Sequence, residues 1–170
     1  MKTCMTILFL LCIYWGIVPL QAQRDFLTSQ EVDAIRDEQE LGKRAILYMD
    51  FAGRRLDAVK AAIASQKDGA GKSVQENLKE YISILEAVET TIADGAEQRS
   101  PLEKALKGLT ERGSEFLKYL QSLEPETTPG FADYRYTLEE AILMTKEAVA
   151  EAEKGPYPEI RKRKSAPSER

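Results

Sequence analysis

Residues 68–92 read DGAGKSVQENLKEYISILEAVETTI, and this stretch decides the fold class. Beyond the glycines, apolar side chains recur at steps of three and four, the spacing of one face of an α-helix. These positions are Val74, Leu78, Tyr81, Leu85, Val88 and Ile92. Ser73 and Glu76 have the spacing of a capping box, which satisfies backbone N–H groups at the start of a helix. The stretch therefore predicts a long amphipathic helix with Ser73 as its cap.

The same stretch contains Gly71-Lys72-Ser73, which closes the phosphate-binding motif G-x-x-x-x-G-K-[S/T]. The opening glycine of that motif is missing, because Gln66 stands five residues before Gly71. A phosphate loop also follows a strand, whereas the preceding AVKAAIASQ has a helical pattern. We therefore interpret DGAGKS as a hinge between two antiparallel helices, to which Gly69 and Gly71 give backbone freedom. No bound nucleotide is expected.

Outward from this stretch, residues 23–155 follow the helical pattern, and no segment shows the sustained period-two alternation of a strand. A short acidic helix begins at a capping box of Thr28 and Glu31. Four longer helices are expected over about 43–66, 73–93, 101–124 and 131–154. The predicted fold is therefore all-α, and short connections make successive helices antiparallel. It is an up-and-down antiparallel bundle of four long helices plus a short N-terminal helix, with a disordered basic C-terminal tail over residues 156–170.

Some side chains of these helices have predicted positions. Ser100 is expected to cap the helix over about 101–124, with Pro101 as its first helical residue. Gly113 falls on an apolar stripe, where the missing side chain permits close approach of a facing helix. Tyr134 and Tyr136 cannot share one helical face, so one is expected in the core and the other in solvent.

The first 22 residues differ from the rest of the chain. Lys2 precedes an apolar run over residues 4–20, and charge appears directly after Ala22. This is the pattern of a secretory signal peptide that is cleaved near Ala22, so residues 1–22 are predicted to be removed. The alternative is an uncleaved membrane anchor, for which the run is short. Either reading places the remainder outside the cytoplasm, in the periplasm or the extracellular medium.

Missing residue types exclude several kinds of chemistry. The sequence contains no histidine, and both cysteines lie in the leader, at Cys4 and Cys12. Residues 23–170 therefore have no disulfide, no thiolate nucleophile, no histidine-based triad and no histidine or cysteine metal ligand. No cofactor and no metal are expected, and the chain is predicted not to be an enzyme.

Acidic residues are abundant on the predicted helices, but their spacing does not indicate a site. Most of them fall beside or opposite the apolar stripes, where solvated charge belongs. They include Glu86, Glu89, Glu139, Glu140, Glu147, Glu151 and Glu153. Arg54 lies within helical reach of Asp50 and Asp57, and Lys79 stands close to Glu76 and Glu80, so we interpret these groups as local ion pairs.

The C-terminal tail contains the most distinctive charge pattern, the run Arg161, Lys162, Arg163 and Lys164. Residues 23–155 carry 18 basic and 26 acidic side chains, a net charge of −8, so the run is opposite in sign to the body. Such a run attracts anionic lipid or an acidic polymer, and we name these four residues as candidate contacts to an anionic partner. The alternative is a solvated tail that contributes only solubility.

Together these features predict an exported, non-enzymatic helical bundle that acts as a binding, adaptor or structural module in the cell envelope or outside the cell. Its expected partner is an envelope protein, and the long apolar stripes are also compatible with a homo-oligomer. An alternative is a carrier that holds a small apolar ligand or lipid among Tyr81, Gly113, Phe116 and Phe131 in the bundle core. A third hypothesis, a polysaccharide-cleaving enzyme that uses only carboxylates, has no residue pair to support it.

Overall fold

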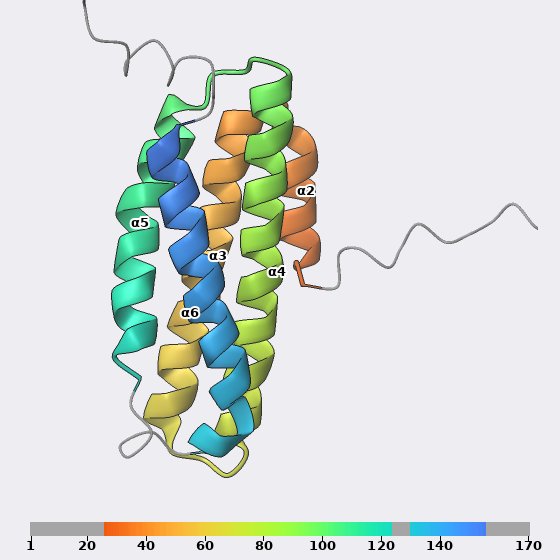
Figure 1. Ribbon diagram of the computed structural model, residues 1–170. Helices are drawn as coiled ribbons and strands as arrows, with labels where there is room; N and C mark the ends of the chain where they lie inside the picture. Colours follow the sequence, from red (N-terminus) through yellow and green to blue (C-terminus); the bar gives the residue numbers. More distant parts are fainter. Residues whose placement is uncertain (1–25, 124–129, 156–170) are drawn as a thin grey trace, which may run out of the picture.

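A computed structural model describes residues 26–123 and 130–155 (Figure 1). The predicted signal peptide and the basic run Arg161–Lys164 lie outside these residues. All regular structure in the described ranges is helical, which confirms the all-α prediction. The helices are α2 (Ser29–Asp37), α3 (Leu41–Ser65), α4 (Ala70–Glu97), α5 (Glu103–Gln121) and α6 (Phe131–Lys154).

The capping box predicted for the short helix is present. The Thr28 side chain accepts from the Glu31 backbone N–H, and the Glu31 carboxylate accepts from the Thr28 N–H at 2.9 Å. The prediction that Ser73 caps α4 is wrong. Gly69, in the left-handed conformation with φ +83°, precedes the helix, and the Ser73 N–H already donates to the Gly69 carbonyl within the first turn. Glycine adopts this conformation without strain, so the chain enters α4 one turn earlier.

The predicted start of α5 at Ser100 and Pro101 is also wrong. Ser100 belongs to the end of α4, because its N–H donates to the Gly95 carbonyl at 2.8 Å and the N–H of Arg99 donates to Ala96. With Arg99 left-handed at φ +54°, these two bonds form a Schellman motif, which satisfies the last carbonyls of the helix. The helix α5 begins only after Leu102, whose side chain is fully buried.

The four long helices lie side by side, but α4 and α5 are not neighbours. Both α3 and α6 pack against α4 and against α5, so α4 and α5 occupy opposite corners (Figure 1). Residues 98–102 therefore cross a diagonal, over the beginning of α3. A Cβ atom at Gly42 of α3 would collide with the Pro101 carbonyl, so this crossing requires the bare glycine backbone.

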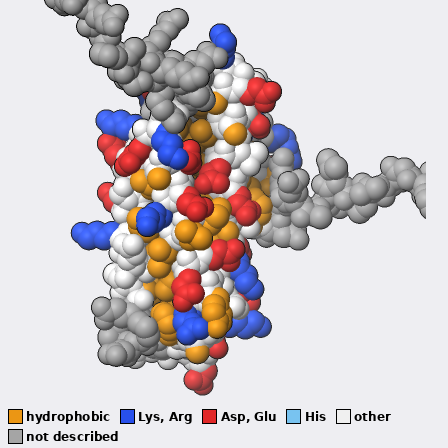
Figure 2. Space-filling model, in the orientation of Figure 1, with side chains coloured by type: hydrophobic (Ala, Val, Ile, Leu, Met, Phe, Trp, Pro, Cys, Tyr) orange, Lys and Arg blue, Asp and Glu red, His pale blue; other side chains and the backbone are white. Residues whose placement is uncertain are grey.

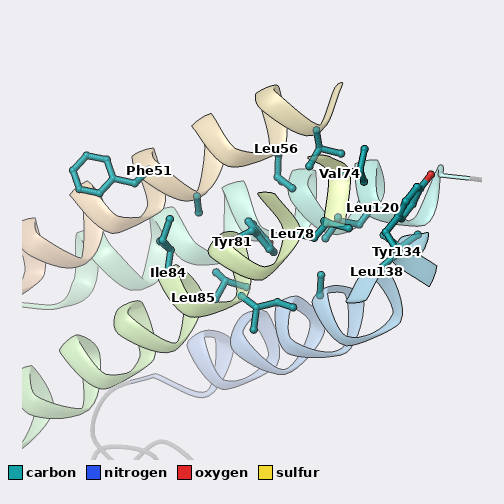
Figure 3. Packing of buried hydrophobic residues seen from close by; sticks show 14 of the residues in the cluster. Phe51, Leu56, Val74, Leu78, Tyr81, Ile84, Leu85, Leu120, Tyr134 and Leu138 are labelled. Carbon is teal, nitrogen blue, oxygen red and sulfur yellow. The ribbon is translucent and has the colours of Figure 1, made fainter. Parts of the chain in front are cut away.

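The larger core cluster fills the space between all four long helices (Figure 3). Among its members are Leu56 of α3, Leu78 and Leu85 of α4, Leu120 of α5 and Leu138 of α6. The predicted close approach at Gly113 is confirmed, because a Cβ atom there would lie 2.5 Å from Val149 Cγ2. Tyr134 is fully buried and Tyr136 is 71% exposed, which confirms the predicted division of the two tyrosines.

One hydrogen-bond pair lies inside this core. Tyr81 Oη on α4 is 2.7 Å from Thr145 Oγ1 on α6, and Thr145 Oγ1 donates to the Ala141 carbonyl at 2.6 Å. Because the single Thr145 proton is used by Ala141, the Tyr81 hydroxyl is the donor to Thr145. Burial raises the pKa of Tyr81 well above its usual value, and the hydrogen bond to Thr145 lowers it only in part. Tyr81 therefore stays neutral and ties α4 to α6.

A buried ion cluster attaches α2 to the long helices. Both terminal guanidinium nitrogens of Arg55 on α3 donate to the Glu31 carboxylate, at 3.1 and 2.7 Å. Arg55 Nε lies 2.5 Å from a Glu80 oxygen on α4, although its N–H does not point at a hydrogen-bond acceptor. We regard the Glu80 contact as an ion pair without a directed hydrogen bond.

Candidate functional site: an acidic groove between α4, α5 and α6

A surface groove of about 630 Å³ lies where the last turns of α6 run between α4 and α5. We call it the groove. Its α4 wall consists of Glu89, Ile92, Ala93 and Ala96. Its α5 wall consists of Leu106 and Leu109. Its α6 wall runs from Glu147 to Gly155 and includes Ala148, Ala150, Glu151, Ala152 and Lys154. The volume lies within the range of about 300–1,000 Å³ that is usual for ligand sites.

The groove exists because the inner face of α6 carries small side chains near the end of the helix and large ones near its start. On α6, Tyr134 and Leu138 fill the interior near the start of the helix, whereas Ala148 and Ala152 occupy the same face near its end. Replacement of large side chains by alanine leaves space that the neighbouring helices do not close completely. The apolar floor of the groove consists of four members of the second apolar cluster, Leu106, Leu109, Ala148 and Ala152. The other members of that cluster, Met49, Val88 and Leu102, do not line the groove.

Carboxylates stand around this apolar floor. Burial raises the pKa of Glu89, and the negative charges of Glu147, Glu86 and Glu151 raise it further. Glu89 is partly buried, and within the described residues no cation lies at ion-pair distance from it. Lys154 is the basic residue of the lining, and it pairs with Glu151 one turn earlier on α6. The groove therefore combines apolar surface with negative charge that is only partly compensated.

Acidic and hydrophobic side chains also lie next to one another more widely on the face that carries α6 (Figure 2). Leu143 on this helix is 54% exposed and Tyr136 is 71% exposed. The sequence interpretation of Glu89 as ordinary solvated charge is thus incomplete, because Glu89 lies partly buried against the groove.

The arrangement favours one kind of chemistry. The partly buried carboxylate of Glu89, which the exposed carboxylates of Glu147 and Glu151 repel, is stabilised when a cation approaches, and the apolar floor is stabilised when hydrocarbon covers it. No three potential metal-ligating side chains gather among residues 26–123 and 130–155. The groove is therefore suited to a ligand that is both basic and apolar.

The residues singled out from the sequence lie elsewhere. Arg161, Lys162, Arg163 and Lys164 are outside the described residues. The four residues proposed to hold an apolar ligand make core contacts. The ring of Phe116 packs edge-on against Tyr81 at 6.0 Å, and that of Phe131 against Tyr134 at 5.4 Å. Gly113 is in contact with Val149.

Sequence reasoning missed the groove, although a signal for it exists. Alanines replace large apolar residues on the inner face of the last α6 turns, and the segment 147–152 reads EAVAEA, with acids beside those alanines. What the sequence lacks is the information that α5 and α4 lie diagonally across from each other and both border this segment.

A scan against models of known protein families, a search of curated proteins and a search of solved structures each found no significant match to this chain. Among the described helices, none combines the length and apolar character that crossing a membrane requires.

Proposed function

We propose that this chain is an exported, non-enzymatic binding module, an up-and-down bundle of four long helices that receives a partner polypeptide in the groove. The partner segment combines basic and apolar side chains. The observation that carries the proposal is that the partly buried carboxylate of Glu89 lines the groove together with Glu147, Glu151 and apolar alanine and leucine side chains.

The physical basis is that two weak terms act at one place. Alanine and leucine side chains around the groove lose contact with water when a hydrocarbon side chain covers them. A lysine or arginine on the same segment relieves the repulsion between Glu89 and Glu147. A helix or an extended segment with basic and apolar positions satisfies both, in the manner of known helix-in-groove recognition.

The test uses a defined probe, a 14-residue helical peptide with leucine on one face and lysine on the other, labelled for fluorescence anisotropy. The expected result is saturable binding that weakens as salt is added, since the charges are partly exposed. A peptide with glutamate in place of every lysine should not bind. Equal binding of both peptides would show that charge complementarity does not operate and would overturn the proposal.

A matched pair of variants locates the binding surface. The double substitution Glu89→Gln with Glu147→Gln removes two groove charges, and we expect it to weaken probe binding by about tenfold. The control, Glu76→Gln with Glu115→Gln, changes the net charge equally at two exposed positions away from the groove lining. The control should alter affinity by less than about twofold, because distant exposed charges are screened.

A further inference from the structure

We infer that the occupant of the groove in the isolated protein is this chain's own C-terminal segment, residues 156–170, with Arg161–Lys164 placed against the groove carboxylates. The inference rests on the proposed function of the groove and names its partner. It also gives the basic run an intramolecular role that the sequence interpretation, which assigned it to an anionic partner, did not include.

The C-terminal segment is joined to the body at the edge of the groove. The helix α6 ends at Lys154, and Gly155 is at once the residue that ends the helix and part of the groove lining. Gly155 has φ +81°, a conformation that glycine adopts readily and that turns the chain away from the helix axis. The point at which residues 156–170 are attached to the body is therefore part of the groove lining.

The C-terminal segment is long enough to reach the groove carboxylates. From Gly155 back to Glu147 is eight residues of helix, or about 12 Å at 1.5 Å per residue. Residues 156–160, if extended, span about 17 Å. A chain that folds back along α6 thus brings Arg161 and Lys162 to the level of Glu147 and Glu89.

The side chains of the C-terminal segment are complementary to those of the groove. The segment reads PYPEIRKRKSAPSER, with Tyr157 and Ile160 ahead of four consecutive basic residues. The groove offers an apolar floor and, farther from Gly155, the carboxylates of Glu147 and Glu89. Glu89 has no cationic partner among the described residues. The order of apolar and then basic groups along the segment suits a path from Gly155 across Ala152 and Ala148 to the carboxylates.

Tethering makes even a weak contact effective. A segment joined directly to its site has an effective concentration in the millimolar range, so a weak intrinsic affinity already fills the groove. Two consequences follow. A basic partner polypeptide must displace the segment, and Arg161–Lys164 cannot contact an anionic surface while the groove holds them.

The experiment compares the full chain from Gln23 to Arg170 with a variant in which the four basic residues of the run are replaced by serine. Backbone amide NMR signals of Ala93, Ala150 and Glu151 report on the groove, and the lysine–leucine probe peptide reports on its availability. A control chain replaces four other exposed lysines, Lys67, Lys72, Lys79 and Lys118, by serine. Both variants have the same net charge.

If the inference is correct, the groove amides shift in the tail variant and not in the control, and the probe binds the tail variant about tenfold more tightly than the unsubstituted chain. Equal probe affinity for all three chains would refute the inference while leaving the proposed function standing. Absence of binding even to the tail variant would instead refute the proposed function. A groove shift that depends on protein concentration would assign the occupant to a second copy and would also overturn the inference.

Discussion

Glu31 of α2 and Arg55 of α3, which are 24 residues apart in the chain, form a buried bidentate ion pair. The pair leaves only 3% of the Glu31 side chain and 10% of the Arg55 side chain exposed. Arg55 Nη2 also donates to the Phe26 carbonyl at 2.8 Å, so one guanidinium holds both the start of α2 and the segment before it. The pair is thus the main polar attachment of α2 to α3.

Replacement of Glu31 by glutamine should destabilise the protein by about 3 kcal/mol. Replacement of Glu31 leaves the largely buried Arg55 guanidinium with Glu80 as its remaining anionic partner, and the loss of charge compensation is where the cost arises. The measurement is urea unfolding followed by circular dichroism. The control is Asp33→Asn, which breaks the exposed pair with Arg36 on the same helix and should cost no more than about 0.5 kcal/mol. Equal effects of the two changes would contradict the importance assigned to Arg55.

Because of the Glu31–Arg55 pair, we expect the folded protein to lose stability in acid. Burial acts to raise the pKa of Glu31, but hydrogen bonds from Arg55 and Thr28 and the charge of Arg55 outweigh it, so the pKa lies below the usual 4.5. Arg54, at 3.6 Å from Glu31, and Glu80, beside Arg55, are the other charged groups at the cluster.

Because the folded state holds this proton less tightly than the unfolded state, the unfolded state binds more protons between the two pKa values. The contribution of Glu31 is therefore complete above about pH 4.5 and is lost as the pH falls through the lowered folded pKa. In a comparison of urea unfolding from pH 6 to pH 3, Glu31→Gln should show a shallower decline than the unsubstituted chain. Parallel declines would contradict the prediction.

Substitution of Gly113 by alanine should destabilise the protein by up to about 2 kcal/mol. The new methyl group collides with Val149 and forces α5 and α6 apart, at a cost of about 1–3 kcal/mol that the gain in helix propensity of about 1 kcal/mol offsets only in part. The control is Gly53→Ala in α3, where the nearest atoms lie at 3.4 Å or more. That change should be neutral or stabilising by up to about 1 kcal/mol. Thermal unfolding of both variants separates packing from propensity.

Tyr81 and Thr145 should show strong energetic coupling. Tyr81→Phe removes one donor and should cost about 1 kcal/mol. Thr145→Val leaves the buried Tyr81 hydroxyl without its acceptor and should cost about 1–3 kcal/mol. The double variant has no stranded hydroxyl, so its loss should be clearly smaller than the sum of the two single losses. Strict additivity in the double-mutant cycle would show that the hydrogen bond contributes little.

Glu89→Gln should stabilise the protein at pH 7 by a few tenths of a kcal/mol, while it weakens probe binding. Burial, followed by the charges of Glu147, Glu86 and Glu151, raises the pKa of Glu89 above 4.5, so the folded state binds this proton more tightly than the unfolded state. The contribution of Glu89 to stability therefore falls as the pH rises from 4.5 through the raised pKa of the folded state.

The stabilisation by Glu89→Gln should disappear near pH 4, where the carboxyl is protonated. Lys154 is the basic group of the groove lining and already pairs with Glu151, so it does not cancel this effect. Urea unfolding at pH 7 and pH 4 checks the prediction, with Glu115→Gln as an exposed control. A destabilised Glu89→Gln variant at pH 7 would indicate that the carboxylate has a favourable partner.

The helices themselves could be predicted because their causes are local. Three-and-four spacing of apolar residues specifies which face is buried, and the Thr28–Glu31 capping box starts α2 where expected. Glycine marks the end of α6 at Gly155, and the bounds of α6 agree with the pattern over 131–154. The predicted cap at Ser73 failed because left-handed Gly69 starts α4 one turn earlier, and that at Ser100 failed because Ser100 takes part in the Schellman motif that ends α4.

The sequence by itself determined the all-α fold, the inner face of each long helix and the exclusion of histidine and thiol chemistry, since these depend on spacing within one helix or on composition. Some ion pairs are local, such as Asp33–Arg36 and Glu151–Lys154, but only the tertiary structure decided the partners of Asp50 and Glu80. Asp50 pairs with Arg112 of α5 at 2.5 Å and Glu80 with Arg55 of α3, in place of the local partners that helical spacing suggested. The groove depends on the same kind of information, because it forms where α4, α5 and α6 meet around short alanine side chains. The pattern along one helix fixes which face is buried but not which helix covers it.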